Sequence, residues 1–322
     1  MIEWVCSVII NRLKLMTSSV RQPNLHHVQC SDAQGGHKMA YWQWGDPAAA
    51  HVVLCVHGLS RQGRDFDTLA ANLVEKAHGN IRVICPDVVG RGESDWLKDP
   101  LGYQIPTYAT DMLALLAQLH ALSPITTLDW VGTSMGGLIG LVVCGQLGLP
   151  LPVSVNKLVL NDVGPAIEWL SIVRIGTYLG APITFDSVQQ GADAMWAIST
   201  GFGPHTPQQW LALSRPMLRP VSDAPGSKLR LHYDPALSVP FKQATEASTL
   251  QGEKTLWQLY DNIKAQTLLL RGADSDLLSP ATAQLMGQRG PKARLVEFAG
   301  VGHAPTLMAV DQVAAVTGFL IG

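Results

Sequence analysis

The pattern Gly-x-Ser-x-Gly at residues 132–136 constrains the fold of this chain more than any other feature. An apolar run at residues 128–131 precedes it, and an apolar segment of helical length, residues 138–147, follows it. These flanks predict a buried strand, a tight turn and a helix, which is the context in which this pattern forms a nucleophile elbow. The glycines on either side of Ser134 leave room for a strained turn. We therefore predict that Ser134 presents its hydroxyl at the carboxyl edge of a sheet.

Strand-like and helix-like segments alternate through most of the chain. The run at residues 51–56 is continuously apolar, which is typical of a parallel strand covered by helices on both faces. This alternation predicts a doubly wound α/β fold with a mostly parallel sheet. The other expected strands are 25–30, 39–44, 81–85, 157–160, 267–270 and 294–298, and the clearest expected helices are 66–77, 108–119 and 305–319.

The alternation fails over residues 164–250, which carry several Trp and Phe residues and frequent Pro without a clear strand rhythm. A chain of 322 residues is also long for one compact domain. An insertion on the side where ligands bind in such sheets predicts a cap over the site. We expect an α/β core formed by residues 25–163 and 251–322, with residues 164–250 as the cap.

Residues 1–24 form a separate leader in this interpretation. Its apolar run, residues 4–10, is interrupted by Asn11, Arg12 and Lys14, well short of the roughly 18–20 residues that a membrane span requires. The basic residues follow the apolar run, whereas in a secretory signal they precede it. We expect a dispensable leader helix or a true start at Met16, with an interfacial anchor as the alternative.

Composition excludes several classes of partner. A net charge of −2 provides no basic surface for nucleic acid, and 47% apolar residues suit a globular, ligand-enclosing protein. The chain has five cysteines, an odd number, and no Cys-x-x-Cys pair or Cys/His metal spacing. We therefore expect a reduced, cytoplasmic location, no metal, no cofactor and no stable membrane span.

A serine nucleophile needs a base, and His303 is the strongest candidate. His232 is the other histidine late in the chain, but only His303 follows the end of an expected strand. It lies in the segment 300–305, between glycines and a Pro that can start a helix. The imidazole can therefore reach over the sheet edge to Ser134.

The base must be oriented by an acid, and in elbow enzymes the chain order is serine, acid, histidine. The expected strand 267–270 runs into a loop with two carboxylates. We prefer Asp276, because Asp274 can serve as a turn-capping residue. Asp162, at the end of the strand 157–160, is the third candidate.

Two backbone amides are expected to hold an oxyanion. One is the amide of Met135, directly after the nucleophile, and the other is that of Leu59, in the loop after the strand 51–56. His57 in the same loop is expected to be structural. Large residues of the cap can line a substrate pocket or form the cap's own core. The candidate pocket residues are Ser60, Arg61, Trp169, Trp196, Phe202 and Trp210, with Tyr178 and Met217 as further cap residues.

Four separated signatures together resemble the α/β-hydrolase superfamily. The resemblance implies an eight-stranded, mostly parallel sheet with an antiparallel second strand, a mobile cap, and hydrolysis through an acyl-enzyme without a cofactor. Relatives often place the acid three residues after the strand-terminal glycine, whereas Asp276 lies four after Gly272, which keeps Asp274 open. The signatures are His57-Gly58, the Asp-x-x-Gly-x-Gly-x-Ser loop at residues 87–94, the elbow at Ser134, and Gly302-His303.

Carboxylic ester hydrolysis is the function that the resemblance favours, on an uncharged, moderately apolar ester of small to medium size. Members that open epoxides or remove halides use Asp in the elbow, so Ser134 disfavours those reactions. The alternatives are carbon–carbon bond hydrolysis of ring-cleavage dienoates, for which Arg61 and Arg91 could hold the acidic substrate, lactone or thioester hydrolysis, and a non-catalytic ligand receptor on the same fold.

Overall fold

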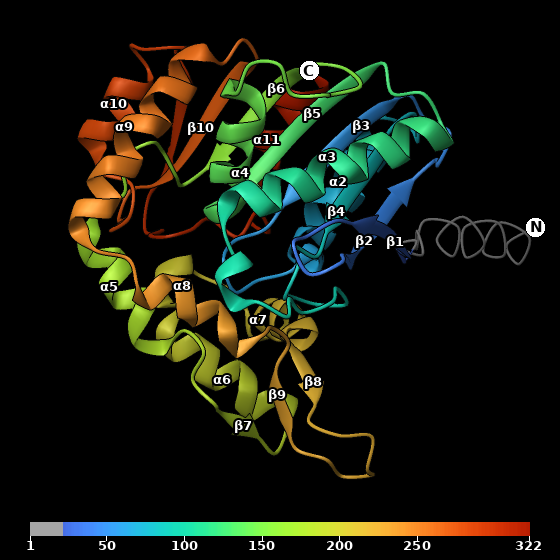
Figure 1. The fold of residues 1–322 in the computed structure, drawn as a ribbon, viewed down its shortest axis with the longest axis vertical. Helices are drawn as coiled ribbons and strands as arrows, with labels where there is room; N and C mark the ends of the chain where they lie inside the picture. The colour runs from blue at the N-terminus through green and yellow to red at the C-terminus, as the bar shows by residue number, and fades with distance from the viewer. Residues whose placement is uncertain (1–21) are drawn as a thin grey trace, which may run out of the picture.

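The computed structural model describes residues 22–322, so the leader predicted for residues 1–24 lies almost wholly outside the described residues. An eight-stranded sheet forms the centre, in the order β1-β2-β4-β3-β5-β6-β10-β11 (Figure 1). β2 runs antiparallel to both of its neighbours, and the other pairs are parallel. The predicted fold class is confirmed. The strands are Asn24–Cys30, His37–Gly45, His51–Val56, Arg82–Pro86, Thr127–Thr133, Val155–Asn161, Gln266–Gly272 and Arg294–Phe298.

Helices cover both faces of the sheet. On one face, α3, α4, α9 and α10 contribute to a core with the inner faces of the strands, whereas α2 and α11 pack on the other. β3 and β4 are buried along almost their whole length, as expected for central strands between two helical layers. Within residues 22–322, no helix is both long enough and apolar enough to span a membrane. The helices are α2 Asp67–Lys76, α3 Ile105–Leu122, α4 Met135–Gly145, α9 Glu246–Asn262, α10 Pro280–Met286 and α11 Val310–Ile321.

A cap is inserted between β6 and β10, and it lies beyond one end of the sheet, in the lower part of Figure 1. It contains a small core of its own around Met195, Trp210 and Met217. A three-stranded antiparallel sheet, β7-β9-β8, also belongs to it, although the sequence showed no strand rhythm there. The cap elements are α5 Trp169–Tyr178, β7 Thr184–Phe185, α6 Val188–Ile198, α7 Pro207–Ser214, β8 Leu218–Pro220, β9 Leu229–Leu231 and α8 Ser238–Lys242.

Helix α9 crosses the boundary that the sequence suggested between residues 250 and 251. It packs on α4, and a Cβ added at Gly145 would lie 2.2 Å from the carbonyl oxygen of Leu259. The absence of a side chain at Gly145 therefore lets α9 lie directly against the helix that follows the elbow. Through this contact, α9 connects the end of the cap to the core.

Candidate active site

Ser134 lies at a sharp turn between β5 and α4. Its φ of 51° and ψ of −117° place a non-glycine residue in a conformation that L-residues rarely adopt. The flanking glycines are required by space, because a Cβ at Gly136 would lie 1.9 Å from the carbonyl oxygen of Val56 and one at Gly132 would lie 2.4 Å from that of Gly136. The local sequence therefore fixes the strained turn that exposes the serine hydroxyl.

His303 reaches this hydroxyl from the loop between β11 and α11. Its Nε2 lies 2.9 Å from Ser134 Oγ. The imidazole side chain is 11% exposed, so it is largely shielded from bulk water. The structure thus brings together the serine and the histidine that the sequence proposed.

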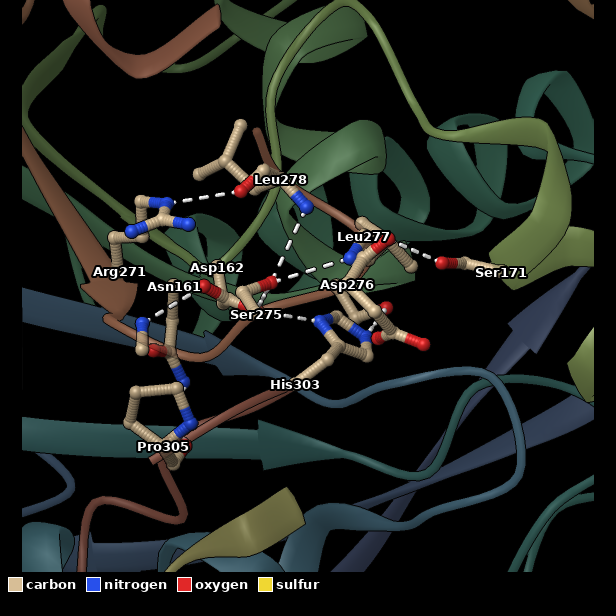
Figure 2. Close-up of polar contacts among 12 residues, drawn as sticks. Asn161, Asp162, Ser171, Arg271, Ser275, Asp276, Leu277, Leu278, His303 and Pro305 are labelled. Atoms are coloured by element: carbon tan, nitrogen blue, oxygen red, sulfur yellow. Dashed lines mark hydrogen bonds and ion pairs between the residues drawn. The ribbon is translucent and has the colours of Figure 1, made fainter. Parts of the chain in front are cut away.

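The carboxylate behind His303 belongs to Asp162, directly after β6, and not to Asp276. Asp162 Oδ2 lies 2.7 Å from His303 Nδ1, and the Asp162 side chain is fully buried. The preferred placement of Asp276 as the acid is therefore wrong. Figure 2 shows Asp162 beside the imidazole, whereas the main chain of Asp276 is joined to Ser171 of the cap.

The two aspartates follow neighbouring strands, but their side chains have different partners. β6 lies directly beside β5, which carries the elbow, whereas β10 is one strand further away. Asp276 Oδ1 and Oδ2 instead accept hydrogen bonds from Arg174, at 3.0 and 2.7 Å. Asp274, the second candidate, is exposed. The signal that was available is that Asp162 is the first carboxylate after the strand that follows the elbow.

Asp162 also accepts hydrogen bonds from the loop after β10. The Ser275 hydroxyl donates to Oδ2 at 2.6 Å, and the Gly272 amide donates to Oδ1 at 2.9 Å. An ionised carboxylate only accepts hydrogen bonds, so this arrangement places a proton on Nδ1 of His303. Nε2 then has a free lone pair facing the hydroxyl of Ser134.

The two predicted oxyanion donors belong to residues close to Ser134, since Leu59 lines the same cavity and Met135 follows Ser134 in the chain. Met135 is the first residue of α4, so its amide has no acceptor within the helix. Leu59 lies in the loop after β3, and a Cβ added at the preceding Gly58 would be 3.6 Å from the Cβ of Ser134. The loop therefore approaches the nucleophile closely enough for its backbone to contact a bound substrate.

His57 holds this loop in place. It is fully buried, its Nδ1 donates to the Gly58 carbonyl at 2.7 Å, and its Nε2 accepts from the Val88 amide at 2.9 Å. Burial lowers the pKa of His57 to about 3, so the ring is neutral. A neutral ring matches the one donor and one acceptor that the loop requires.

Arg91 is a buried residue beside the site whose position the sequence did not indicate. Its Nε donates to the carbonyl of Leu59 at 2.8 Å, and its Nη2 lies 3.2 Å from the sulfur of Met135. The guanidinium also lies over the ring of Tyr108, 4.9 Å from its centroid. Arg91 therefore contacts both residues that carry the candidate oxyanion donors.

The loop at residues 87–94, which contains Arg91, is built around a buried carboxylate. Asp87 Oδ1 accepts from the Gly63 amide at 2.7 Å and Oδ2 from the Glu93 amide at 3.0 Å. Burial raises the pKa of Asp87 to about 7. These bonds hold the turn together and attach it to the segment at Gly63, so Asp87 has a structural role beside the site.

A cavity of about 200 Å³ opens at Ser134 and His303 between the core and the cap. Three of the six candidate pocket residues border it, namely Ser60, Arg61 and Phe202, as do the two further cap residues, Tyr178 and Met217. Its remaining cap side is formed largely by apolar side chains. These are Ile175, Ile183, Met195, Ile198 and Leu231.

The three tryptophans proposed for the pocket do not line it. Trp210 is buried in the core of the cap, where its Nε1 donates to the Ala192 carbonyl at 2.7 Å. Trp196 packs edge-on against Trp210 with ring centroids 4.9 Å apart. Trp169 begins α5 away from the cavity lining. Trp196 and Trp210 therefore belong to the core of the cap, the alternative that the sequence left open.

Comparison with protein families gives a match to the model of the Alpha/beta hydrolase family over residues 53–316. The chain belongs to this family. Among curated members, the chain is 46% identical over 300 residues to a 3-hydroxybutyrate-oligomer hydrolase of Cupriavidus necator, covering 93% of this chain and 98% of that protein.

Solved structures of other proteins agree with this architecture. An alpha/beta hydrolase of Novosphingobium aromaticivorans matches with a TM-score of 0.76 and 30% identity, over 93% of this chain and 98% of that chain. A protein of Rickettsia typhi matches with a TM-score of 0.78 and 28% identity, over 93% and 99% of the two chains. The fold likeness therefore includes the cap as well as the core.

Proposed function

We propose that this chain hydrolyses carboxylic esters through an acyl-enzyme, and that its substrates are short linear oligomers of 3-hydroxybutyrate. The observation that carries the proposal is the hydrogen-bonded series Ser134–His303–Asp162 at the end of the cavity. The relative named for this substrate, 46% identical over nearly the whole chain, supports the choice of oligomer.

The proposed first step uses the geometry of the series. His303 Nε2 removes the proton of the Ser134 hydroxyl as the oxygen attacks the ester carbonyl. Asp162 stabilises the resulting imidazolium through Nδ1. The amides of Leu59 and Met135 donate to the oxyanion, and removal of one such donor typically costs about a hundredfold to a thousandfold in rate.

His303 then returns the proton to the departing alcohol, which completes the formation of the acyl-enzyme. A water molecule then enters, His303 takes its proton, and the hydroxide attacks the acyl-enzyme to release the acid and regenerate Ser134.

The cavity of about 200 Å³ is smaller than the pockets of roughly 300–1,000 Å³ that typically bind drug-sized ligands. A pocket of that size supports a short acyl unit on the apolar cap side rather than a folded polymer.

The positions of Arg61 and Arg91 give little support to the alternative function, carbon–carbon bond hydrolysis. Arg91 is buried and donates to backbone carbonyls of its own loop and of Leu59, outside the cavity lining. Arg61 borders the cavity but is paired with Asp65. A coloured dienoate that loses absorbance on mixing with the protein would favour that alternative.

The deciding experiment combines labelling and turnover. A fluorophosphonate probe should modify the wild-type protein at Ser134, mapped by peptide mass spectrometry, and incubation with the 3-hydroxybutyrate trimer should release monomer. Labelling without turnover of the trimer or of p-nitrophenyl butyrate would favour the ligand-receptor alternative. Absence of labelling and of turnover would reject the mechanism.

The cytoplasmic location stays a prediction, which cell fractionation tests.

A further inference from the structure

Helix α5 of the cap brings one half-exposed cation to the cavity of Ser134. Arg174 has a side-chain exposure of 42%. It borders the Ser134 cavity and also a second hollow of about 490 Å³, and the two spaces share Arg174, Tyr178, Ile198 and His303. Arg174 therefore faces any substrate that extends from the serine through this opening.

Within residues 22–322, the lining of the cavity contains arginine side chains but no carboxylates. The described residues that line it include Arg61 and Arg174 but no aspartate or glutamate. Arg61 is 13% exposed and donates to both carboxylate oxygens of Asp65 at 2.7 Å and to the Leu213 carbonyl at 3.2 Å. Its guanidinium is thus engaged in a shielded pair and is poorly placed to exchange partners.

Arg174 is engaged differently. Its Nε and Nη2 donate to the two oxygens of Asp276 at 2.7 and 3.0 Å, and the Asp276 side chain is 50% exposed. A solvent-exposed pair of this kind adds little to stability, so its partners can be exchanged at small cost. The Asp276 carboxylate therefore occupies a position on Arg174 that the carboxylate of a ligand can also take.

We propose that Arg174 is a specificity-determining residue that binds the free terminal carboxylate of an oligoester substrate in place of Asp276. This proposal rests on the function proposed above, since a linear hydroxybutyrate oligomer carries one carboxylate at its acid end. The substrate class is then an anionic oligoester, in contrast to the uncharged ester expected from the sequence.

The exchange matches the chemistry of both partners. The planar guanidinium offers two parallel N–H donors to any carboxylate, so the substrate replaces Asp276 without a change in protonation. Ser171 of α5 donates to the backbone carbonyl of Asp276 and keeps the helix attached after the side chains separate. Asp274 and Asp276 border only the open hollow, so the carboxylate meets less repulsion from the cavity side.

The test compares a 3-hydroxybutyrate dimer with its methyl ester, in which the terminal charge is removed, and measures cleavage of the internal ester alone, which releases methyl 3-hydroxybutyrate from the methyl ester. Wild-type protein should favour the free acid in kcat/KM by about tenfold at low ionic strength. R174M should abolish the preference by raising KM for the acid, with the methyl ester little changed. D276N removes the internal competitor and should lower KM for the acid, so the two variants move this KM in opposite directions.

A matched control comes from Arg289 and Asp261 on the core. Their side chains are 42% and 40% exposed, and the guanidinium donates to both carboxylate oxygens, at 3.2 and 2.5 Å. R289M and D261N repeat the same charge changes outside both hollows. The preference for the acid should be unchanged in these controls, which separates local binding from long-range attraction.

The outcomes distinguish the two proposals. Equal kcat/KM for the acid and the methyl ester in wild-type protein, or an unchanged preference in R174M, overturns the role of Arg174 and leaves ester hydrolysis standing. If R174M and D276N change KM for both substrates in the same direction, the ion pair acts by holding the cap on the core, and the proposal is wrong. Turnover of p-nitrophenyl butyrate but of neither dimer by wild-type protein overturns the role of Arg174 and leaves ester hydrolysis standing, whereas no turnover of the dimers, the trimer or p-nitrophenyl butyrate would reject ester hydrolysis and the role of Arg174 with it.

Discussion

At the cavity and at the edge of the sheet, an imidazole is hydrogen-bonded to a buried aspartate, and the second partner of each imidazole distinguishes the two pairs. At the cavity, His303 lies between Asp162 and the hydroxyl of Ser134. At the edge of the sheet, His37 lies between Asp111 and Asp32, with both N–O distances at 2.9 Å. The pairing alone therefore does not define a catalytic site.

The charge state expected at His37 explains the difference. Burial opposes protonation of His37, but the hydrogen bonds to Asp111 and Asp32 outweigh it and raise its pKa. A histidine with carboxylates on both nitrogens favours the imidazolium, which has no lone pair to act as a base. His303, with a hydroxyl on Nε2, keeps that lone pair available.

The sheet-edge cluster even contains a potential nucleophile. The ligand atoms of Cys30, His37 and Asp111 all lie within 4.8 Å of one another. Burial raises the pKa of the Cys30 thiol, and the nearby Asp111 adds to this effect. The sulfur therefore remains a thiol and packs as an apolar group. The contrast teaches that access and the second partner decide which pair can do chemistry.

The largest expected effect tests which of the two nucleophiles acts. Ser134→Ala should lower kcat for p-nitrophenyl butyrate by about a millionfold, as for removal of the serine from comparable triads. Cys30→Ala is the matched change in the other cluster and should leave kcat within about twofold, because a buried thiol takes no part. Substantial esterase activity in the serine variant, measured after active-site titration, would refute the assignment.

The next effect tests which aspartate orients His303. Asp162→Asn removes the charge behind Nδ1 and should lower kcat by about ten-thousandfold, the loss seen when a triad acid becomes an amide. Asp276→Asn makes the same chemical change on the exposed residue and should stay within about threefold on the neutral methyl ester. A comparable loss in both variants would contradict the assignment of Asp162.

A smaller effect concerns the support of the oxyanion donors. Arg91→Met removes the bond to the Leu59 carbonyl and the contact with Met135, so kcat should fall by about tenfold to a hundredfold, less than the loss of a donor itself. Arg82→Met is the control. Arg82 is also buried and donates to backbone carbonyls, but of Pro47, Leu119 and Ser123. Arg82→Met should lower the midpoint temperature of thermal unfolding and leave kcat unchanged.

The sequence predicted those parts of the molecule that depend on local pattern. The elbow at Ser134 is specified by glycines within two residues, and the apolar runs specified the strands. The acid could not be chosen this way, because Asp162 and Asp276 both follow parallel strands. Which of them reaches His303 depends on contacts of the loops after β6 and β10, because Gly272 and Ser275 hold Asp162 whereas Asp276 pairs with Arg174. Periodicity does not encode these contacts.

The pocket shows the same limit of local pattern. Trp210 and Phe202 are both large aromatic residues of the cap, yet Trp210 is 7% exposed in the cap core whereas Phe202 borders the cavity. The side of a cap helix that faces the core is set by packing between distant segments. Composition could identify the cap but could not separate its core from its lining.

The smallest effect on activity is expected at the sheet-edge pair, where stability should change instead. His37→Gln leaves the buried carboxylate of Asp111 without its cation, and loss of one partner of a buried pair costs about 3 kcal/mol or more in the free energy of unfolding. Urea denaturation should detect this loss, while kcat of the folded variant stays near that of wild type. A kcat loss comparable with that of the Asp162 variant would contradict the comparison.

The pH dependence of that stability has a definite sign. Because the folded-state pKa of His37 is raised, its contribution is fully present below the unfolded value of about 6.5 and is lost as the pH rises through the folded value. The difference in unfolding free energy between wild type and His37→Gln should therefore be greatest in mild acid and shrink toward alkaline pH. Ser134→Ala should follow the wild-type profile, because it leaves the groups around His37 (Asp32, Asp111 and Cys30) unchanged. A difference that grows with pH would mean that His37 is held neutral, as His57 is, and that the two carboxylates bind a neutral imidazole.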